Sequence, residues 1–173
     1  MDPALDLTLR LSLAGLFLAA AAHKLSDLRR FRATLEGYDL LPAPLVAPAS
    51  VAVPGAEIAA ALLLFIGSGG GAAILLLFYA AVIAVSLLRG RREIDCGCFG
   101  FGERQTIVWG LVGRNLLLVA VSLATFVPSS DRALLWVDYL TAAAATLTLA
   151  ACWVAAAAMA ALGPARERLR GVS

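Results

Sequence analysis

The residues of this chain best suited to chemistry are two cysteines that flank a single glycine. Cys96 and Cys98 lie in the run 95–100, Asp-Cys-Gly-Cys-Phe-Gly, and the whole chain holds only three cysteines. Sulfurs at this spacing can close a small disulfide ring, for which Gly97 provides the backbone freedom. Strained disulfides tend to be the labile and catalytic ones. The pattern therefore predicts either thiol–disulfide exchange or binding of a soft metal ion such as Cu(I) or Hg(II).

The charges around the two sulfurs decide their reactivity, because the thiolate is the reactive form. Asp95 disfavours a thiolate on the adjoining Cys96, whereas His23 and Lys24, at the end of the first apolar segment, are candidates to stabilise one or to transfer a proton. The alternative for His23 and Lys24 is an interfacial role, with the lysine extending to the lipid headgroups. No metal is assigned, because a structural zinc site needs four protein ligands and the chain has no second pair of closely spaced cysteines.

Glu57 and Arg114 are the two charges expected well inside apolar segments, where an ionisable residue is costly without a partner and is a functional candidate. We expect Glu57 to pair with Arg114, either as a structural link or in the handling of protons or a quinone. Asn115 is expected to add a hydrogen bond between helices. Cys152 lies in an alanine-rich run and is expected to be a small packing residue, with a resolving thiol as the alternative.

The elements that hold these residues must be membrane helices. Hydrophobic residues make up 61% of the 173-residue chain and charged residues 15%. The mean hydropathy of +0.88 is too high for a soluble domain. Gly163 and Pro164 are expected to end the last helix. The chain is predicted to be a single all-α domain over residues 1–173, a polytopic membrane helical bundle with a cysteine loop at 89–105. Its five apolar segments approach the roughly 20 residues that cross a hydrocarbon core and cover about 7–23, 45–66, 71–88, 106–127 and 134–162.

Lysines and arginines are distributed unevenly between the two ends of the predicted helices. Because positively charged loops stay in the cytoplasm, we expect a multi-pass protein of the cell inner (plasma) membrane, with its N-terminus outside and its cysteine loop and C-terminus on the cytoplasmic side. The lipid bilayer is its expected surrounding, and the chain lacks the aromatic-studded basic patch that would indicate nucleic acid. The outer end has only Arg10 and Arg132, and the cytoplasmic end has Lys24, Arg29, Arg30, Arg32, Arg89, Arg91, Arg92, Arg104, Arg166, Arg168 and Arg170.

Several short pieces, taken in their order, resemble the methylamine utilisation protein MauE family, within the DoxX-like group of small helical membrane proteins. The resemblance covers residues 7 to about 127 and implies a DoxX-like four-helix core with a fifth transmembrane helix added. The Cys-Gly-Cys-Phe-Gly core is its most specific part. The matching pieces are residues 22–27, Phe31, residues 38–42, residues 54–57, residues 95–100, Trp109, Arg114 and Asn115.

The resemblance implies a thiol–disulfide oxidoreductase or redox relay that works with a thioredoxin-like protein in the maturation of disulfide-rich extracytoplasmic proteins. The case named in the family is the small subunit of methylamine dehydrogenase. The DoxX-like group implies quinone-linked or thiosulfate-linked redox work instead. Two further alternatives are a carrier of a soft metal ion that uses the same dithiol, and a non-catalytic membrane anchor for a redox complex. A partner outside the cell conflicts with a cytoplasmic cysteine loop, unless the sulfurs move or another carrier intervenes.

Overall fold

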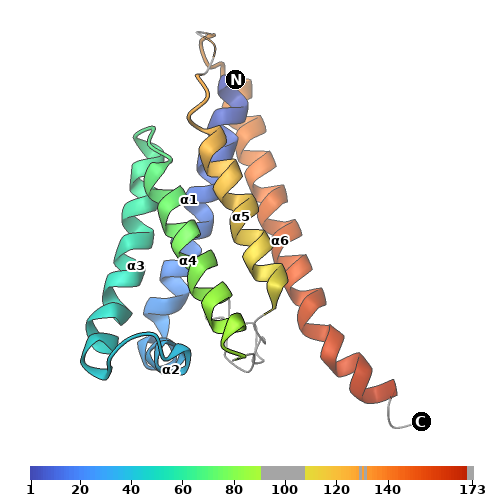
Figure 1. Ribbon diagram of the computed structural model, residues 1–173. Coiled ribbons are helices and arrows are strands. Elements are labelled where there is room, and N and C mark those ends of the chain that lie inside the picture. The colour runs from blue at the N-terminus through green and yellow to red at the C-terminus, as the bar shows by residue number, and fades with distance from the viewer. Residues whose placement is uncertain (91–107, 129, 131, 171–173) are drawn as a thin grey trace.

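The computed structural model describes residues 1–90, 108–128, 130 and 132–170, with side chains described as far as residue 156. The described residues form helices and no strand, which confirms an all-α polytopic bundle (Figure 1). Asp95, Cys96 and Cys98 lie outside the described residues. The helices are α1 Pro3–Ser26, α2 Leu28–Tyr38, α3 Ala43–Phe65, α4 Gly70–Leu88, α5 Trp109–Ala124 and α6 Trp136–Arg170.

Each of the five predicted apolar segments coincides with a helix, but their lengths differ. Helices α1, α3 and α4, and residues Trp136–Ala156 of α6, are long and apolar enough to cross a membrane. Helix α5 has 16 residues and is the shortest of the apolar helices. The expected stop at Gly163 and Pro164 is wrong, since α6 continues to Arg170. A proline removes its own N–H bond and clashes with the preceding turn, yet neighbouring groups make such helices tolerable in membranes.

Helix α2 is an element that the apolar pattern did not predict. It follows α1 after one residue, Asp27, whose side chain accepts a hydrogen bond from the backbone N–H of Arg30 at 3.0 Å. Phe31, Thr34 and Tyr38 form its buried face, at the spacing expected for one side of a helix. Figure 1 shows α2 at one end of the bundle, beside the ends of α1, α3 and α4.

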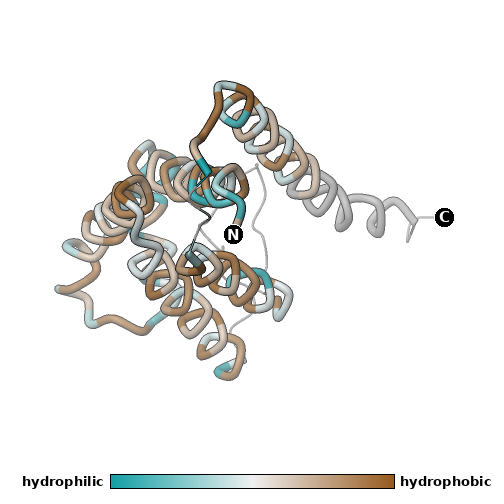
Figure 2. The backbone as a smooth tube through the Cα atoms, turned by 90° about the horizontal axis from the view of Figure 1, so that it is seen from above, coloured by the Kyte–Doolittle hydropathy of each residue, from teal (hydrophilic) through white to brown (hydrophobic). Residues whose placement is uncertain are grey.

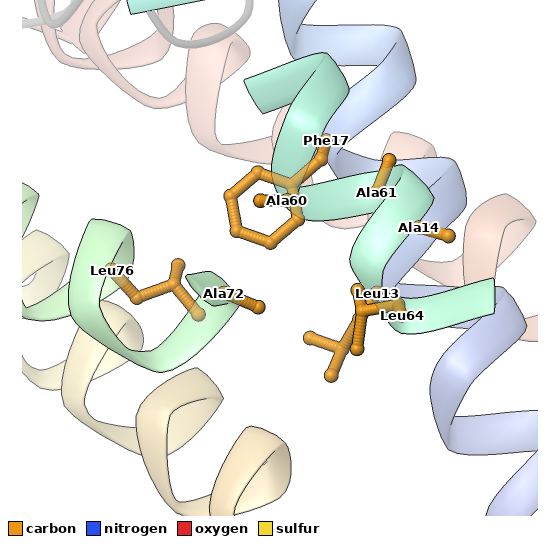
Figure 3. Packing of buried hydrophobic residues seen from close by; sticks show 8 residues of the cluster. All are labelled: Leu13, Ala14, Phe17, Ala60, Ala61, Leu64, Ala72 and Leu76. Carbon is orange, nitrogen blue, oxygen red and sulfur yellow. The ribbon is translucent and has the colours of Figure 1, made fainter. Parts of the chain in front are cut away.

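The core of the bundle is made mainly by α1, α3 and α4. Alanines alternate with larger side chains at the crossings, which lets helix backbones approach closely, as is usual between membrane helices. Phe17 is the largest fully buried side chain among the described residues. Figure 3 shows how the cluster fills the space between the three helices. Its members are Leu13, Ala14, Phe17, Ala60, Ala61, Leu64, Ala72 and Leu76.

Helix α6 lies at the edge of the bundle and packs mainly on α1. Figure 2 shows hydrophobic residues along most of the length of the helices, and many of the large ones are exposed on the outside of the bundle. Within residues 136–156, Ala142 is the only buried residue. The Ser12 hydroxyl donates to Thr146 Oγ1 at 3.4 Å, which gives a polar link between α1 and α6. The described part of α6 therefore presents most of its apolar surface to the surroundings of the chain, as a lipid-facing helix does.

The two ends of the bundle are built from different connections. At one end, the ammonium of Met1 donates to the carbonyl of Pro128 at 2.6 Å, and Arg132 bridges Asp2 and Asp138 at 3.2 and 2.9 Å. The opposite end holds α2, the end of α4 and the start of α5. The segment that joins α4 to α5 and carries the Cys-Gly-Cys run therefore begins and ends on the side where α2 lies.

Candidate functional site

A buried ion pair links α1 to α3. The Lys24 ammonium donates to Glu57 Oε1 at 2.5 Å, and the side chains are only 5% and 1% exposed. The hydroxyl of Tyr79, on α4, donates to the same oxygen at 2.8 Å. A buried charge is tolerated when it is paired and hydrogen-bonded. Three helices thus converge on one carboxylate oxygen.

Two aromatic rings complete the surroundings of the ammonium. Lys24 Nζ lies 5.7 Å from the ring centroid of Phe31 on α2 and 5.8 Å from that of Tyr79. Both distances are within the range of a cation–π interaction, which is stronger where water is excluded. Helix α2, unpredicted by hydropathy, therefore closes the site from the end of the bundle.

Lys24 replaces the partner that was expected for Glu57. The prediction that Glu57 pairs with Arg114 is wrong, because the ion pair of Glu57 is made with Lys24. The alternative in which Lys24 extends to the headgroups is also wrong, since its side chain is buried. The guanidinium of Arg114 instead lies over the ring of Trp153 on α6 at 5.1 Å. Position along a helix can be counted from the sequence, but the side of the helix that faces each neighbour cannot.

Asn115 is buried, but its side-chain amide forms a hydrogen bond within its own helix. Asn115 Nδ2 donates to the carbonyl of Leu111 at 2.9 Å, so the expected hydrogen bond between helices is not formed by this donor.

His23 is half-buried and lines neither of the cavities described below, although it adjoins Lys24. Successive helical residues point about 100° apart, which separates these two side chains. Cys152 is exposed on α6, so the expectation that it packs in the interior is wrong.

Two cavities meet at Lys24 and Tyr79, which line both. The larger has a volume of about 420 Å³ and lies between α2, α3 and α4. The smaller has a volume of about 20 Å³ and reaches Glu57, Arg114 and Asn115, enough space for about one water molecule.

Two of the residues that line the smaller cavity each have a buried polar atom without a hydrogen-bond partner. Within the described part of the chain, Glu57 Oε2 and Arg114 Nε are both buried and have no hydrogen-bond partner. Each such atom carries a desolvation cost of about 1–3 kcal/mol. The arrangement is that of a carboxylate with one oxygen held by Lys24 and Tyr79 and the other oxygen without a hydrogen bond, beside a small and mostly apolar cavity that Arg114 also lines.

Sequence reasoning identified Lys24, Glu57 and Arg114 but missed Tyr79 and Trp153. Tyr79 lies in the most apolar of the helices, where a hydroxyl needs a partner. That requirement was a usable signal for Tyr79. Trp153 gave no such signal, because its contact with Arg114 depends on how α6 packs.

Comparison with known proteins relates most of the chain to one family. The family model of methylamine utilisation protein MauE matches residues 2–128, which include the whole Lys24–Glu57–Tyr79 cluster. No solved structure matches the chain.

Three curated relatives, each named methylamine utilization protein MauE, are similar over most of the chain. The protein from Paracoccus versutus is 44% identical over 127 residues, 70% of this chain and 68% of the relative. That from Paracoccus denitrificans is 35% identical, over 72% of this chain and 69% of its own length. The protein from Methylorubrum extorquens is 37% identical, over 76% of this chain and 75% of its own length. This chain therefore belongs to the methylamine utilisation protein MauE family.

Proposed function

We propose that this protein is a membrane redox component of methylamine utilisation that exchanges disulfides with a thioredoxin-like protein through Cys96 and Cys98. The relatives bear the name of that process. The pair of cysteines supplies a chemistry that the rest of the chain does not offer. The observation that carries the proposal is the buried Lys24–Glu57–Tyr79 cluster near the end of the bundle to which the cysteine segment is attached.

The exchange proceeds through a mixed disulfide. The thiolate of one cysteine attacks a sulfur of the partner's disulfide, the other partner sulfur leaves as a thiolate, and the second cysteine then displaces the partner. The partner gains two electrons and two protons as its disulfide becomes a dithiol, and Cys96 and Cys98 end joined by an S–S bond. The reverse sequence oxidises the partner.

The proposal includes an orientation in the inner membrane, with the N-terminus outside and the cysteine segment on the cytoplasmic side. Arg29, Arg30, Arg32 and Arg89 lie at the α2 end of the bundle, which supports a cytoplasmic position for that end. The opposite end holds Arg132, which forms ion pairs with Asp2 and Asp138. Its positive charge is offset there by two carboxylates.

Thiol trapping tests the proposal directly. Membrane-permeant and impermeant maleimides are applied to intact cells and to inverted vesicles that carry the wild-type protein or the variants Cys96→Ser and Cys98→Ser. We expect a reversible disulfide in the wild type, and a mixed disulfide with a thioredoxin-like protein in one single variant. Cys152→Ser is the matched control and should behave as the wild type, because Cys152 is exposed on α6 and lines neither cavity.

Two results would contradict the proposal. Thiols that stay reduced under oxidising growth, and are protected only when Cu(I) is added, would favour a metal carrier. Normal methylamine utilisation in the double variant Cys96→Ser/Cys98→Ser, with the protein inserted in the membrane, would favour a non-catalytic anchor.

A further inference from the structure

The cavity of about 420 Å³ between α2, α3 and α4 opens toward the outside of the bundle. Figure 1 shows α3 and α4 diverging from the turn that joins them toward the end where α2 lies. Two of the lining residues, Leu41 and Phe78, are also 37% and 56% exposed. The volume falls in the range of about 300–1,000 Å³ that is typical of ligand sites. An apolar ligand can therefore enter this cavity sideways, from the bilayer.

Three polar side chains of the cavity wall already have partners within the protein. Lys24 donates to the carboxylate of Glu57. The Tyr79 hydroxyl donates to the same carboxylate at 2.8 Å, and the Thr34 hydroxyl donates to the carbonyl of Arg30 at 3.2 Å. Most of the remaining wall is aliphatic or aromatic. A ligand that needs no polar partner there, such as a hydrocarbon chain, therefore suits this wall.

The position of the cavity along α4 matches the depth of one lipid leaflet. Arg89 directly follows the last residue of α4, and an arginine at the end of a membrane helix extends to the headgroups. The stretch from Phe78 to Arg89 is about 16 Å long at a rise of about 1.5 Å per helical residue. One leaflet supplies about half of the roughly 30 Å of hydrocarbon. The lining residues Val82 and Ile83 lie between these two levels, where the acyl chain of a lipid runs.

The guanidinium of Arg89 is placed to hold the phosphate of such a lipid. Its side chain is exposed, and its Nη1 donates to the carbonyl of Asp39 at 3.4 Å. Asp39 directly precedes Leu40 and Leu41, which both line the cavity. A guanidinium has five N–H donors, and the bond to Asp39 uses one of them. The other donors can bind phosphate oxygens, which a guanidinium recognises in pairs.

We propose that this cavity binds one acyl chain of a phospholipid from the leaflet on the α2 side, with the lipid phosphate on Arg89. The chain lies between α3 and α4, against the buried face of α2, and reaches the rings of Phe31 and Tyr79 beside Lys24. Bound in this way, the chain keeps water away from the ion pair of Lys24 with Glu57. The assignment is independent of the thiol chemistry, because no part of it involves a cysteine.

Photolabelling distinguishes an acyl chain in the cavity from lipid on the outer surface. The full chain is reconstituted in phosphatidylcholine nanodiscs with a phosphatidylglycerol that carries a diazirine near the end of one acyl chain. We expect label on Phe31, Thr34 or Tyr38, which line the cavity and are at most 8% exposed, so that lipid outside the bundle does not reach them. Label confined to exposed residues such as Leu62 and Leu117 would overturn the site.

Matched substitutions ask whether the cavity itself admits the chain. Val53→Trp adds bulk to the cavity wall, and Val51→Trp adds the same bulk to the same helix at a residue that is 54% exposed. We expect Val53→Trp to lower the labelling of α2 about fivefold or more and Val51→Trp to leave it unchanged within about twofold. Ala49→Phe in the wall and Ala47→Phe at an exposed position are a second pair, used if Val53→Trp does not fold. Equal labelling of α2 within the pair would overturn the site.

Arg89→Gln tests the contact with the headgroup. Native mass spectrometry of the protein in mild detergent measures the lipid that stays bound, and we expect a single phospholipid on the wild-type chain. Arg89→Gln should retain about threefold less. Arg29→Gln is the matched control and should retain the wild-type amount, because this exposed arginine lies about 15 Å along α2 from Asp39. No retained lipid on the wild type, a free fatty acid as the bound species, or equal retention by the two variants would overturn the proposal.

Discussion

Lys24 on α1 donates a hydrogen bond to Glu57 on α3, 33 residues further along the chain, in a part of the bundle where both side chains are almost completely buried. A buried pair of this kind does not always add stability, because removing two charges from water costs about as much as their attraction returns. Removing one partner has a different effect, because it leaves the other charge buried alone.

Single and double substitutions of this pair should therefore behave differently. We expect Lys24→Met and Glu57→Leu to lower the free energy of unfolding by about 3–5 kcal/mol each, and the double variant to lie close to the wild type. Reversible unfolding in mixed detergent micelles measures all three. A double variant whose loss equals the sum of the two single losses would show that the residues do not interact. Arg132→Gln, at the exposed end of the bundle, serves as a control for loss of one charge.

The hydroxyl of Tyr79 should have a measurable effect of its own. Tyr79→Phe removes the 2.8 Å hydrogen bond to Glu57 but keeps the ring beside Lys24. We expect a loss of about 1–3 kcal/mol in the free energy of unfolding, because the buried and charged acceptor would lose a hydrogen bond. Tyr139→Phe is the matched control, because Tyr139 is 55% exposed. An equal effect from both substitutions would mean that the Tyr79 hydroxyl does not support the carboxylate.

Gly69, in the α3–α4 turn, packs tightly against the C-terminal end of α5. A Cβ atom there would clash with Thr125 Oγ1 and would lie 2.8 Å from the carbonyl oxygen of Ser122. The Ser122 hydroxyl also donates to the carbonyl of Gly69 at 2.8 Å. We expect Gly69→Ala to destabilise the protein by about 1–3 kcal/mol through overpacking.

The matched control for Gly69→Ala lies on α5. Gly113 is inside that helix, and a Cβ atom added to it would have no other atom within 4 Å beyond its own helix backbone and chain neighbours. Gly113→Ala should therefore be neutral or stabilise the protein by up to about 1 kcal/mol, since alanine is the better helix former. Thermal unfolding of the two variants side by side measures the difference, and equal melting temperatures would contradict the close packing at Gly69.

The attachment of the N-terminus should depend on pH only in acid. The backbone N–H of Ala4, and then the guanidinium of Arg132, hold the pKa of Asp2 below its usual value of 3.8. The folded form thus favours the carboxylate, so its contribution is present above the unfolded pKa and is lost as the pH falls through the lower folded pKa. Hydrogen exchange of residues 2–6 should quicken, after correction for the intrinsic rate, only below about pH 4. Asp2→Asn should abolish that dependence, and a transition near neutral pH would contradict this assignment.

The cysteines should be required for methylamine utilisation in cells. Cys96→Ser and Cys98→Ser should each abolish growth on methylamine when they replace the wild-type protein in a methylamine-utilising bacterium that lacks its own copy. Cys152→Ser should support growth at the wild-type rate. Immunoblots of the membrane fraction establish that each variant is inserted. Loss of growth with Cys152→Ser alone would give that exposed residue the role of a resolving thiol, the alternative to a packing role.

The hydropathy of the chain was enough to predict a helical membrane protein, and each of the five predicted apolar segments coincides with a helix, four of which are long enough to cross a membrane. The length of an apolar run can be counted along the chain, and the hydrocarbon thickness sets the required length. The same approach missed α2, because this helix has few apolar residues and owes its stability to burial of Phe31, Thr34 and Tyr38. The predicted end of α6 at Gly163 and Pro164 was also too early, because neighbouring groups decide whether a helix continues through a proline.

The sequence by itself determined which residues carry charge, thiols and hydroxyls and roughly how far along each helix they lie. Only the tertiary structure decided that Glu57 meets Lys24 and Tyr79 while Arg114 meets Trp153. A partner depends on the rotation of each helix about its axis and on which helices are neighbours. Those quantities are set by the packing of Phe17, Leu64 and the alanines between α1, α3 and α4. These apolar side chains fit one arrangement of the bundle better than others, but their types in the sequence do not indicate which distant residue each one will contact.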